Sequence, residues 1–126
     1  MTDLLLNLWL LASLVAPFAP QSNHPPIARA DQRVVLYYPA AIVDLAVLEN
    51  DMDADGDSLQ VIGLSSVQGG KAEVVNGALV RVVPDWSRVS GGGLEHLVAQ
   101  GTYLVSDGAA VRQARWTVWY WAVMQP

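Results

Sequence analysis

An acidic loop between two strand-forming segments constrains this chain more than any other feature. Every second position from 51 to 57 is an aspartate, and Gly56 lies among them. The acids are Glu49, Asp51, Asp53, Asp55 and Asp57. Like charges this close repel one another unless a cation lies between them, and Ca2+ takes about six to eight oxygen ligands in flexible geometry. The spacing therefore predicts a structural calcium site, with a solvated acidic turn as the alternative.

The acidic loop differs from an EF-hand, the helix-loop-helix calcium motif. Counted from Asp51, the twelfth position is Ile62, where an EF-hand needs a glutamate. Residues 42–47 and 59–62 are rich in β-branched side chains, which favour strands over helices. The acids therefore lie in a loop between strands. We expect Glu49, together with Asp31 and Asp107 from neighbouring turns, to supply further ligands.

The rest of the chain shows short strand patterns separated by turn residues. The predicted strands are residues 33–38, 41–48, 59–64, 72–75, 78–83, 102–106 and 112–123. Asn76-Gly77 predicts a tight hairpin because both positions tolerate a positive φ. Within the second strand, Val43, Leu45 and Val47 are expected to point to one side and Ile42, Asp44 and Ala46 to the other. Short strands without helical periodicity predict an all-β sandwich of two sheets over residues 31–126.

Four motifs occur in order along the chain. They consist of Asn23, Pro26, Ala28 and Asp31, then of Leu48, Asn50, Asp51, Asp53, Asp55, Gly56, Asp57 and Leu59, then of Pro84, and finally of Tyr103, Val105, Asp107 and Gly108. Over residues 23–123 the chain thereby resembles the bacterial cadherin-like and Ig-like repeats of large adhesins, the tandem-95 and VCBS types. This resemblance implies an Ig-like or cadherin-like Greek-key β-sandwich. Three departures stand out: Gln32 replaces a common aspartate, Gly101 replaces a usual phenylalanine, and residues 86–100 form a longer stretch than usual.

Composition excludes several function classes. The net charge of −5 and a single lysine argue against nucleic-acid binding. The chain has no cysteine, which excludes disulfides and thiolate metal sites. His24 and His96 lie far apart without ligand spacing, and we expect surface histidines rather than zinc ligands. No nucleophile elbow or phosphate-binding loop occurs, so we expect no enzymatic activity.

The N-terminal segment is a nearly continuous apolar run from Leu4 to Ala19. As a helix it would be about 24 Å long, which is short for a membrane span of about 20 residues. The leading prediction for residues 1–20 is an uncleaved membrane-associated helix with Trp9 near an interface. A cleaved signal peptide and a buried core helix are the alternatives. Residues 21–30 form a polar, proline-rich linker.

The last predicted strand carries three tryptophans. Alternation places Trp116, Val118 and Tyr120 on one face and Trp119 and Trp121 on the other. One face can fill the core, whereas the other meets water in an isolated domain. Tryptophan is enriched at interface hot spots and at membrane boundaries. The pattern predicts a docking face at these two tryptophans, unless residues 86–100 cover them.

These observations together predict a non-enzymatic module. With 52% hydrophobic and only 15% charged residues, we expect a membrane or a partner to cover part of the chain. The leading hypothesis is an accessory or scaffolding subunit of a larger membrane protein complex, anchored at the extracytoplasmic, periplasmic face of a bacterial membrane. Trp86 and Trp9 are further candidate partner contacts. The alternatives are a secreted or cell-surface calcium-dependent adhesion repeat and, less favoured, a carbohydrate-binding module that stacks sugars on Trp86, Trp119 and Trp121.

Overall fold

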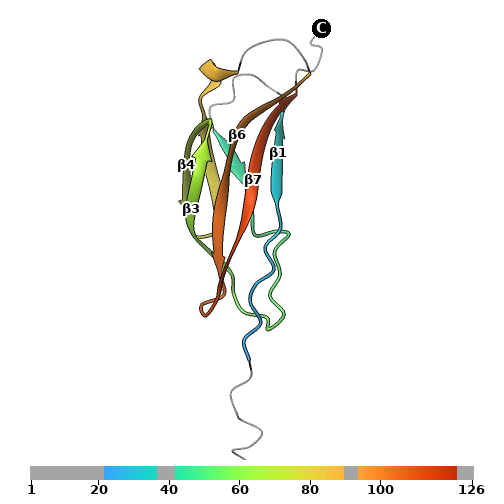
Figure 1. The fold of residues 1–126 in the computed structure, drawn as a ribbon, viewed down its shortest axis with the longest axis vertical. Coiled ribbons are helices and arrows are strands. Elements are labelled where there is room, and N and C mark those ends of the chain that lie inside the picture. Colours follow the sequence, from blue (N-terminus) through green and yellow to red (C-terminus); the bar gives the residue numbers. More distant parts are fainter. Residues whose placement is uncertain (1–21, 37–41, 90–93, 122–126) are drawn as a thin grey trace, which may run out of the picture.

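The described part of the protein is a two-layered all-β structure. A computed structural model describes residues 22–36, 42–89 and 94–121 (Figure 1). Their strands are β1 (Asp31–Val35), β2 (Val43–Leu45), β3 (Gln60–Gln68), β4 (Gly70–Val75), β5 (Leu79–Pro84), β6 (Glu95–Ser106) and β7 (Val111–Trp121), with a short 3-10 helix η2 (Trp86–Arg88) after β5. The predicted N-terminal helix lies outside the described residues. Within them, no helix has the length and hydrophobicity needed to cross a membrane.

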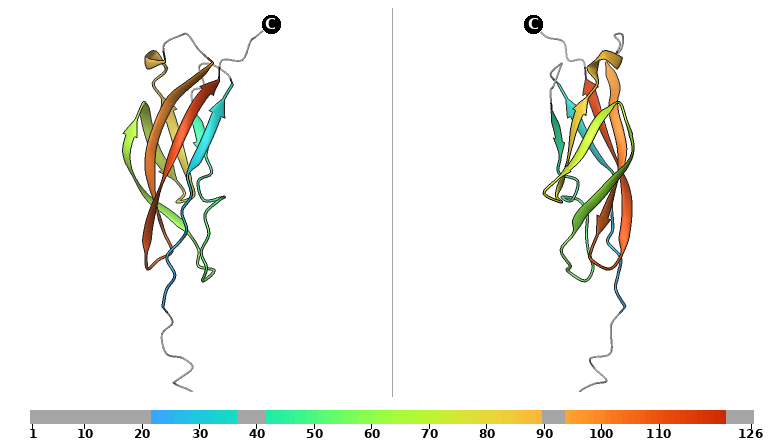
Figure 2. Two further views of the ribbon diagram at one scale, coloured as in Figure 1. Left: turned by 45° about the vertical axis from the view of Figure 1, so that its right-hand side comes forward. Right: turned by 90° about the vertical axis from the view of Figure 1, so that its left-hand side faces the viewer.

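Two sheets pack face to face, as predicted. One has the strand order β1-β7-β6-β3 and the other has the order β2-β5-β4 (Figure 2). β1 runs parallel to β7, and the remaining neighbours are antiparallel. β1 and β2 follow one another in the chain but belong to different sheets, so the chain crosses from one sheet to the other between them. The core lies between the two sheets. This arrangement confirms the sandwich.

The strand boundaries differ most from the sequence prediction in β2 and β6, and β3 continues to Gln68, four residues beyond its predicted end. The second predicted strand is ordered as β2 for only three residues, because the chain turns at Ala46 toward Glu49. In the opposite sense, β6 begins at Glu95, seven residues before the predicted start. The stretch 86–100 was expected to be an extended loop, but it contains η2 and the first half of β6. A bulge between Leu97 and Ala99 hides the alternating pattern there.

Turn chemistry explains the hairpins well. Asn76 and Gly77 both adopt positive φ, at 54° and 63°, and the Ala78 N–H donates to the Val75 carbonyl at 3.1 Å. This is the hairpin that the Asn-Gly pair predicts. The second turn, at Asp107-Gly108, joins β6 to β7, and Gly108 has a φ of 98°. Both turns place their acids and amides at sheet ends.

The core is built from alternate residues of strands in both sheets. The buried hydrophobic core residues, each at most 6% exposed, are Val43, Leu45, Val47, Val61, Val80, Val82, Val98, Ala99, Tyr103, Val105, Trp116 and Val118. Val43, Leu45 and Val47 therefore share one side, which is buried, and the expected inward face of the last strand is confirmed. The Trp116 indole covers Gly101 on the neighbouring strand, where an added Cβ would lie 2.5 Å from the ring.

Candidate metal site and interaction face

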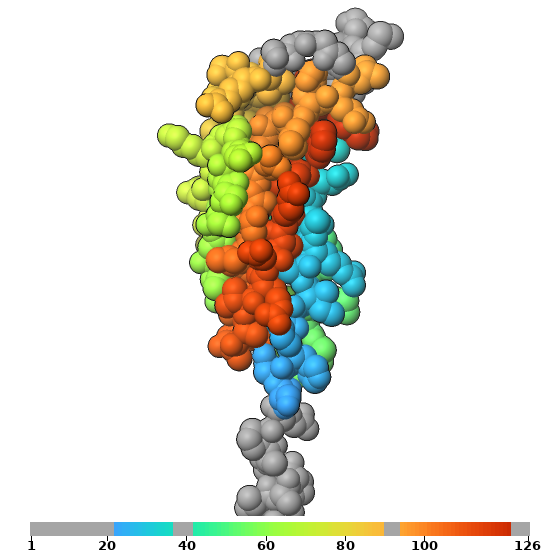
Figure 3. Space-filling model, in the orientation of Figure 1, coloured from blue at the N-terminus to red at the C-terminus, as the bar shows by residue number. Residues whose placement is uncertain are grey.

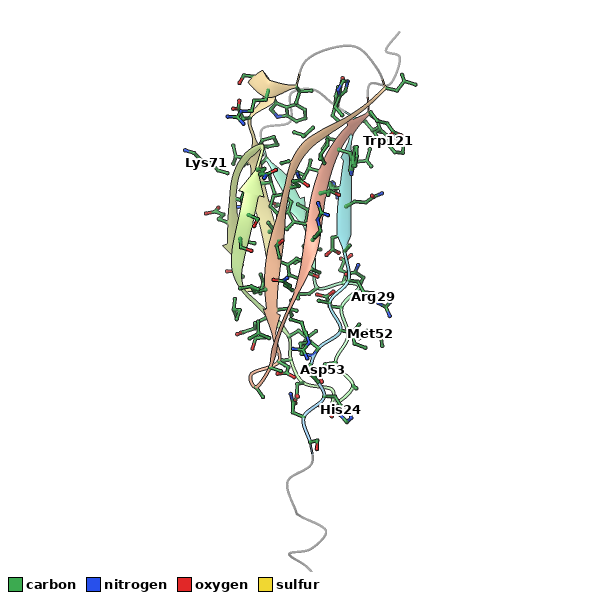
Figure 4. All side chains as sticks on the ribbon, in the orientation of Figure 1. His24, Arg29, Met52, Asp53, Lys71 and Trp121 are labelled. Carbon is green, nitrogen blue, oxygen red and sulfur yellow. The ribbon has the colours of Figure 1, made fainter. Side chains whose placement is uncertain are left out.

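The acidic loop lies at one end of the sandwich, beyond the end of β2. The N-terminal lead-in runs beside it, and Ile27 and Met52 exchange two backbone hydrogen bonds of 2.7 and 3.0 Å. The loop then turns at Gly56, whose φ is 73° and whose N–H donates to the Asp53 carbonyl at 3.1 Å. Figure 4 places Asp53 and His24 at this end and Trp121 at the opposite end. The acids and the tryptophans therefore belong to two separate surfaces.

Three of the predicted ligands form a compact cluster. Asp53, Asp55 and Asp57 each offer a carboxylate oxygen, and these oxygens lie within 4.8 Å of one another. Asp53 Oδ1 accepts the backbone N–H groups of Asp55 and Asp57 at 2.8 and 3.3 Å. The second oxygen, Asp53 Oδ2, is buried without a hydrogen-bond partner. A buried acceptor beside two further carboxylates fits a hard cation, which would bind it directly.

Asp107 joins this cluster from the turn between β6 and β7. The pKa of Asp57 is raised by burial and then by the negative charges of Asp53, Asp107 and Asp55. The pKa of Asp107 itself is lowered to about 2 by the Ala110 N–H, the Asn23 side chain and the Ala109 N–H. Asp107 is therefore ionised at neutral pH. Its charge adds to the potential that would attract a cation.

The cluster also has an internal partner that sequence analysis missed. The His24 backbone N–H donates to Asp55 Oδ2 at 2.7 Å, and His24 Nδ1 lies 2.8 Å from Asp55 Oδ1. The hydrogen bond to Asp55 raises the pKa of His24 and lowers that of Asp55. His24 remains exposed, as expected for a surface histidine. Its contact was hidden because 31 residues separate the two side chains in the chain.

Asp51 turns away from this cluster and has a structural role. Its Oδ1 accepts the Arg29 N–H at 2.9 Å, and its Oδ2 accepts the Tyr103 hydroxyl at 2.7 Å. The same hydroxyl lies 3.0 Å from the Arg29 carbonyl and 3.2 Å from the Val47 carbonyl. These contacts tie the lead-in, the end of β2 and β6 together around Asp51.

Asp31 and Glu49 lie on the Asp51 side as well. Burial, together with the negative charges of Asp51 and Glu49, raises the pKa of Asp31 to about 6. Both Asp31 and Glu49 line a hollow between β1 and β2. The structure thus divides the seven predicted ligands into two groups. Asp53, Asp55, Asp57 and Asp107 gather in one, and Asp31, Glu49 and Asp51 gather in the other.

The predicted docking face is the outer surface of the β1-β7-β6-β3 sheet. Trp119 and Trp121 point away from the core side, where Trp116 and Val118 are fully buried, and Trp121 is 43% exposed. Trp119 pairs with Leu97 on β6 and with Val34 on β1, so an apolar row crosses three strands. The Trp119 indole N–H donates to Thr117 Oγ1 at 3.1 Å, which turns the ring back along its own strand.

Trp86 lies on the other side of β7. Its ring meets Tyr120 edge to face at a centroid distance of 5.8 Å, and Tyr120 belongs to the inward-facing set. His96 stacks on the same Tyr120 ring at 6.0 Å. Trp86 therefore packs at the end of the core and does not extend the Trp119 row. Trp9 lies outside the described residues.

Comparison with known proteins agrees with this geometry. No curated protein and no solved structure matches the chain. One family does match, and its match runs from the lead-in that carries Asn23 to the outer-face Trp119 of β7, a span that includes both sheets and the acidic loop. The chain, through residues 23–119, belongs to the bacterial Ig domain family.

Proposed function

We propose that this chain is a non-enzymatic binding module on the extracytoplasmic face of a bacterial membrane, and that it works as an accessory subunit of a larger membrane protein complex. Membership of the bacterial Ig domain family supports a surface interaction module rather than an enzyme. The apolar segment of residues 1–20 would anchor the module, with Trp9 near the interface. The docking contact would be the outer face of the β1-β7-β6-β3 sheet.

One observation carries this proposal. Val34, Trp119 and Leu97 form a continuous apolar row on three neighbouring strands, and Trp121 follows in the next row. Each aromatic side chain can bury about 150–250 Å2, so two tryptophans supply a large part of the roughly 800 Å2 that one partner contributes to a standard interface. The aliphatic neighbours favour a protein surface, because sugars stack on rings and gain little from Val34 or Leu97.

The docking proposal is tested with the double substitution Trp119→Ala and Trp121→Ala. We expect the variant to remain folded but to leave the complex when membranes are solubilised in mild detergent and fractionated by size. The matched control is Ile62→Ala with Val111→Ala, two exposed apolar residues far from the tryptophan row. If the double tryptophan variant unfolds, or if it stays in the complex, the face is not the docking surface.

We further propose that Ca2+ stabilises the acidic end of the module. Asp53, Asp55 and Asp57 would bind the ion, with Asp107 as a nearby fourth carboxylate. The buried oxygen of Asp53 that lacks a hydrogen-bond partner supports this set. Bound Ca2+ would neutralise the repulsion among the carboxylates and hold the loop against the turn that joins β6 to β7.

Calcium binding predicts a change in thermal stability. Ca2+ that binds only the folded state stabilises it by about 2.7 kcal/mol at about one hundred times the dissociation constant. We expect a higher melting temperature with Ca2+ than with a chelator, and a loss of this difference in Asp57→Asn. Glu73→Gln, an exposed acid of β4, is the control that keeps the difference. Equal melting temperatures would mean that the loop is an acidic turn held by its own hydrogen bonds.

Two other functions make different predictions. A secreted or cell-surface calcium-dependent adhesion repeat would be recovered from the medium without other subunits. A carbohydrate-binding module would bind polysaccharide through Trp119 and Trp121, in a manner that free sugar competes with. The Trp119→Ala, Trp121→Ala variant serves for both comparisons, because only the subunit role predicts its release from a membrane complex.

A further inference from the structure

The outer face of the β1-β7-β6-β3 sheet has an unusual distribution of charge. Strand pairing places on it an apolar row of Val34, Trp119 and Leu97 and a neutral polar row of Gln32, Thr117, Gln100 and Gln68. Of the described residues that the pairing of β1, β7 and β6 places on this face, only Glu95 and Arg115 are charged. The face therefore carries one anion and one cation.

Glu95 and Arg115 flank these two rows, one on each side along the strand direction. Glu95 pairs with Trp121, and Arg115 pairs with Thr102. Trp121 lies six positions after Arg115 in β7, which corresponds to about 20 Å along the strand. The midpoint between Trp121 and Arg115 lies near Trp119 and Thr117. The two charges are thus placed almost evenly about an apolar and neutral centre.

Hydrogen bonds orient Arg115 so that its guanidinium can donate to a carboxylate. Its Nη2 donates to Gln100 Oε1 at 2.9 Å, and Gln100 Nε2 donates to Gln68 Oε1 at 3.0 Å. These side chains border a hollow of about 210 Å3 beside Thr102. None of the ion pairs within the described residues includes Arg115 or Glu95. The amide chain orients the guanidinium without neutralising its charge.

We infer that a second copy of this chain covers the face, in a two-fold symmetric dimer. The two-fold axis lies between the outer faces of the two copies, parallel to the sheets and perpendicular to β7, and it passes between Trp119 and Thr117. It places each Arg115 over the partner copy's Trp121. Glu95 is the cross-strand neighbour of Trp121, so the same guanidinium reaches that carboxylate too. Because the interface is isologous, each Arg115–Glu95 contact is made twice.

The chemistry of the face suits this occupant. Arginine over a tryptophan ring gains a cation–π contact, and arginine and tryptophan are enriched at interface hot spots. Sheets of sandwiches pack about 10 Å apart with their strands within about 30°, which brings the two Trp119 rows together near the axis. A partner of unrelated sequence would need its own cation and anion in matching places, whereas a second copy has them by symmetry.

The inference rests on the proposed function in one respect, that this outer face is the docking surface. It is tested by charge exchange in the full chain, in detergent with micelles in excess over protein. The chain lacks cysteine, so Lys71→Cys on the opposite sheet provides a single labelling site (Figure 4). Energy transfer between donor-labelled and acceptor-labelled chains then reports association over a concentration series.

The charge-exchange variants are Arg115→Glu and Glu95→Arg. In each homodimer two like charges meet, and we expect association to weaken at least tenfold. In a heterodimer of the two variants every contact joins opposite charges, and the same holds for a homodimer of the chain that carries both substitutions. The mixture and the doubly substituted chain should therefore recover association. Arg112→Glu, an exposed arginine of β7 that strand alternation places on the opposite face from Arg115, is the control that associates like the unmodified chain.

The results separate this inference from the docking proposal. If neither single variant weakens association, or if the mixture fails to recover it while both variants melt like the unmodified chain, the symmetric dimer is wrong. If the unmodified chain stays monomeric but Trp119→Ala with Trp121→Ala still releases it from the membrane complex, the face docks onto a different protein. In that case the dimer is overturned and the proposed function stands.

Discussion

Replacing Trp116 with alanine is expected to lower the free energy of unfolding by about 3–5 kcal/mol. Trp116 is fully buried on the core side of β7, and its ring fills the space in front of Gly101 on β6. Removing the indole leaves a cavity between two strands that the backbone cannot close. Urea denaturation followed by circular dichroism measures the loss, because that signal does not depend on the tryptophan removed.

The same contact predicts the effect of filling the glycine. An alanine Cβ at position 101 would lie 2.5 to 2.9 Å from three atoms of the Trp116 ring, closer than side chains approach. We expect Gly101→Ala to cost about 1–3 kcal/mol. The cost should nearly vanish when Trp116→Leu is also present, because the smaller side chain leaves room for the methyl group. Trp121→Ala on the exposed face is the control. A loss of free energy of unfolding in Trp121→Ala as large as that in Gly101→Ala would contradict this account.

Tyr103→Phe is expected to destabilise the fold by about 1.5–3 kcal/mol, the range for a hydrogen bond to a charged group. The substitution keeps the buried ring but removes the hydroxyl that donates to Asp51. It also leaves the nearby carbonyls of Arg29 and Val47 without this polar neighbour. The expected result is a lower urea midpoint with an unchanged slope, since the native sandwich is retained.

A double-mutant cycle tests whether the Asp51 contact is responsible. We combine Tyr103→Phe with Asp51→Ala and expect a coupling energy of at least about 1 kcal/mol, as contacting residues show. Additive losses would mean that the hydroxyl acts through the carbonyls alone. Asp57→Ala in place of Asp51→Ala is the control, because Asp57 lies in the separate cluster of Asp53, Asp55 and Asp57, and it should add independently to Tyr103→Phe in the absence of Ca2+.

The sequence alone determined the local features of this fold, namely strand alternation and turn positions. Alternation along a strand has a period of two, so the inward placement of Trp116 and Val118 and the outward placement of Trp121 followed directly. The Asn76-Gly77 turn followed from the conformational freedom of those two residues. The acidic loop was placed between strands because its flanks are β-branched.

Only the tertiary structure decided which side chains become neighbours. Alternation assigns a residue to a face but says nothing about the register of the adjacent strand, so the row that joins Val34, Trp119 and Leu97 was not predictable. The bulge after Leu97 also concealed the first half of β6. Asp51 lies outside the cluster of Asp53, Asp55 and Asp57 and accepts a hydrogen bond from Tyr103, which is 52 residues away in the chain. Contacts over such distances depend on how whole strands pair and pack, and a local sequence pattern does not contain that information.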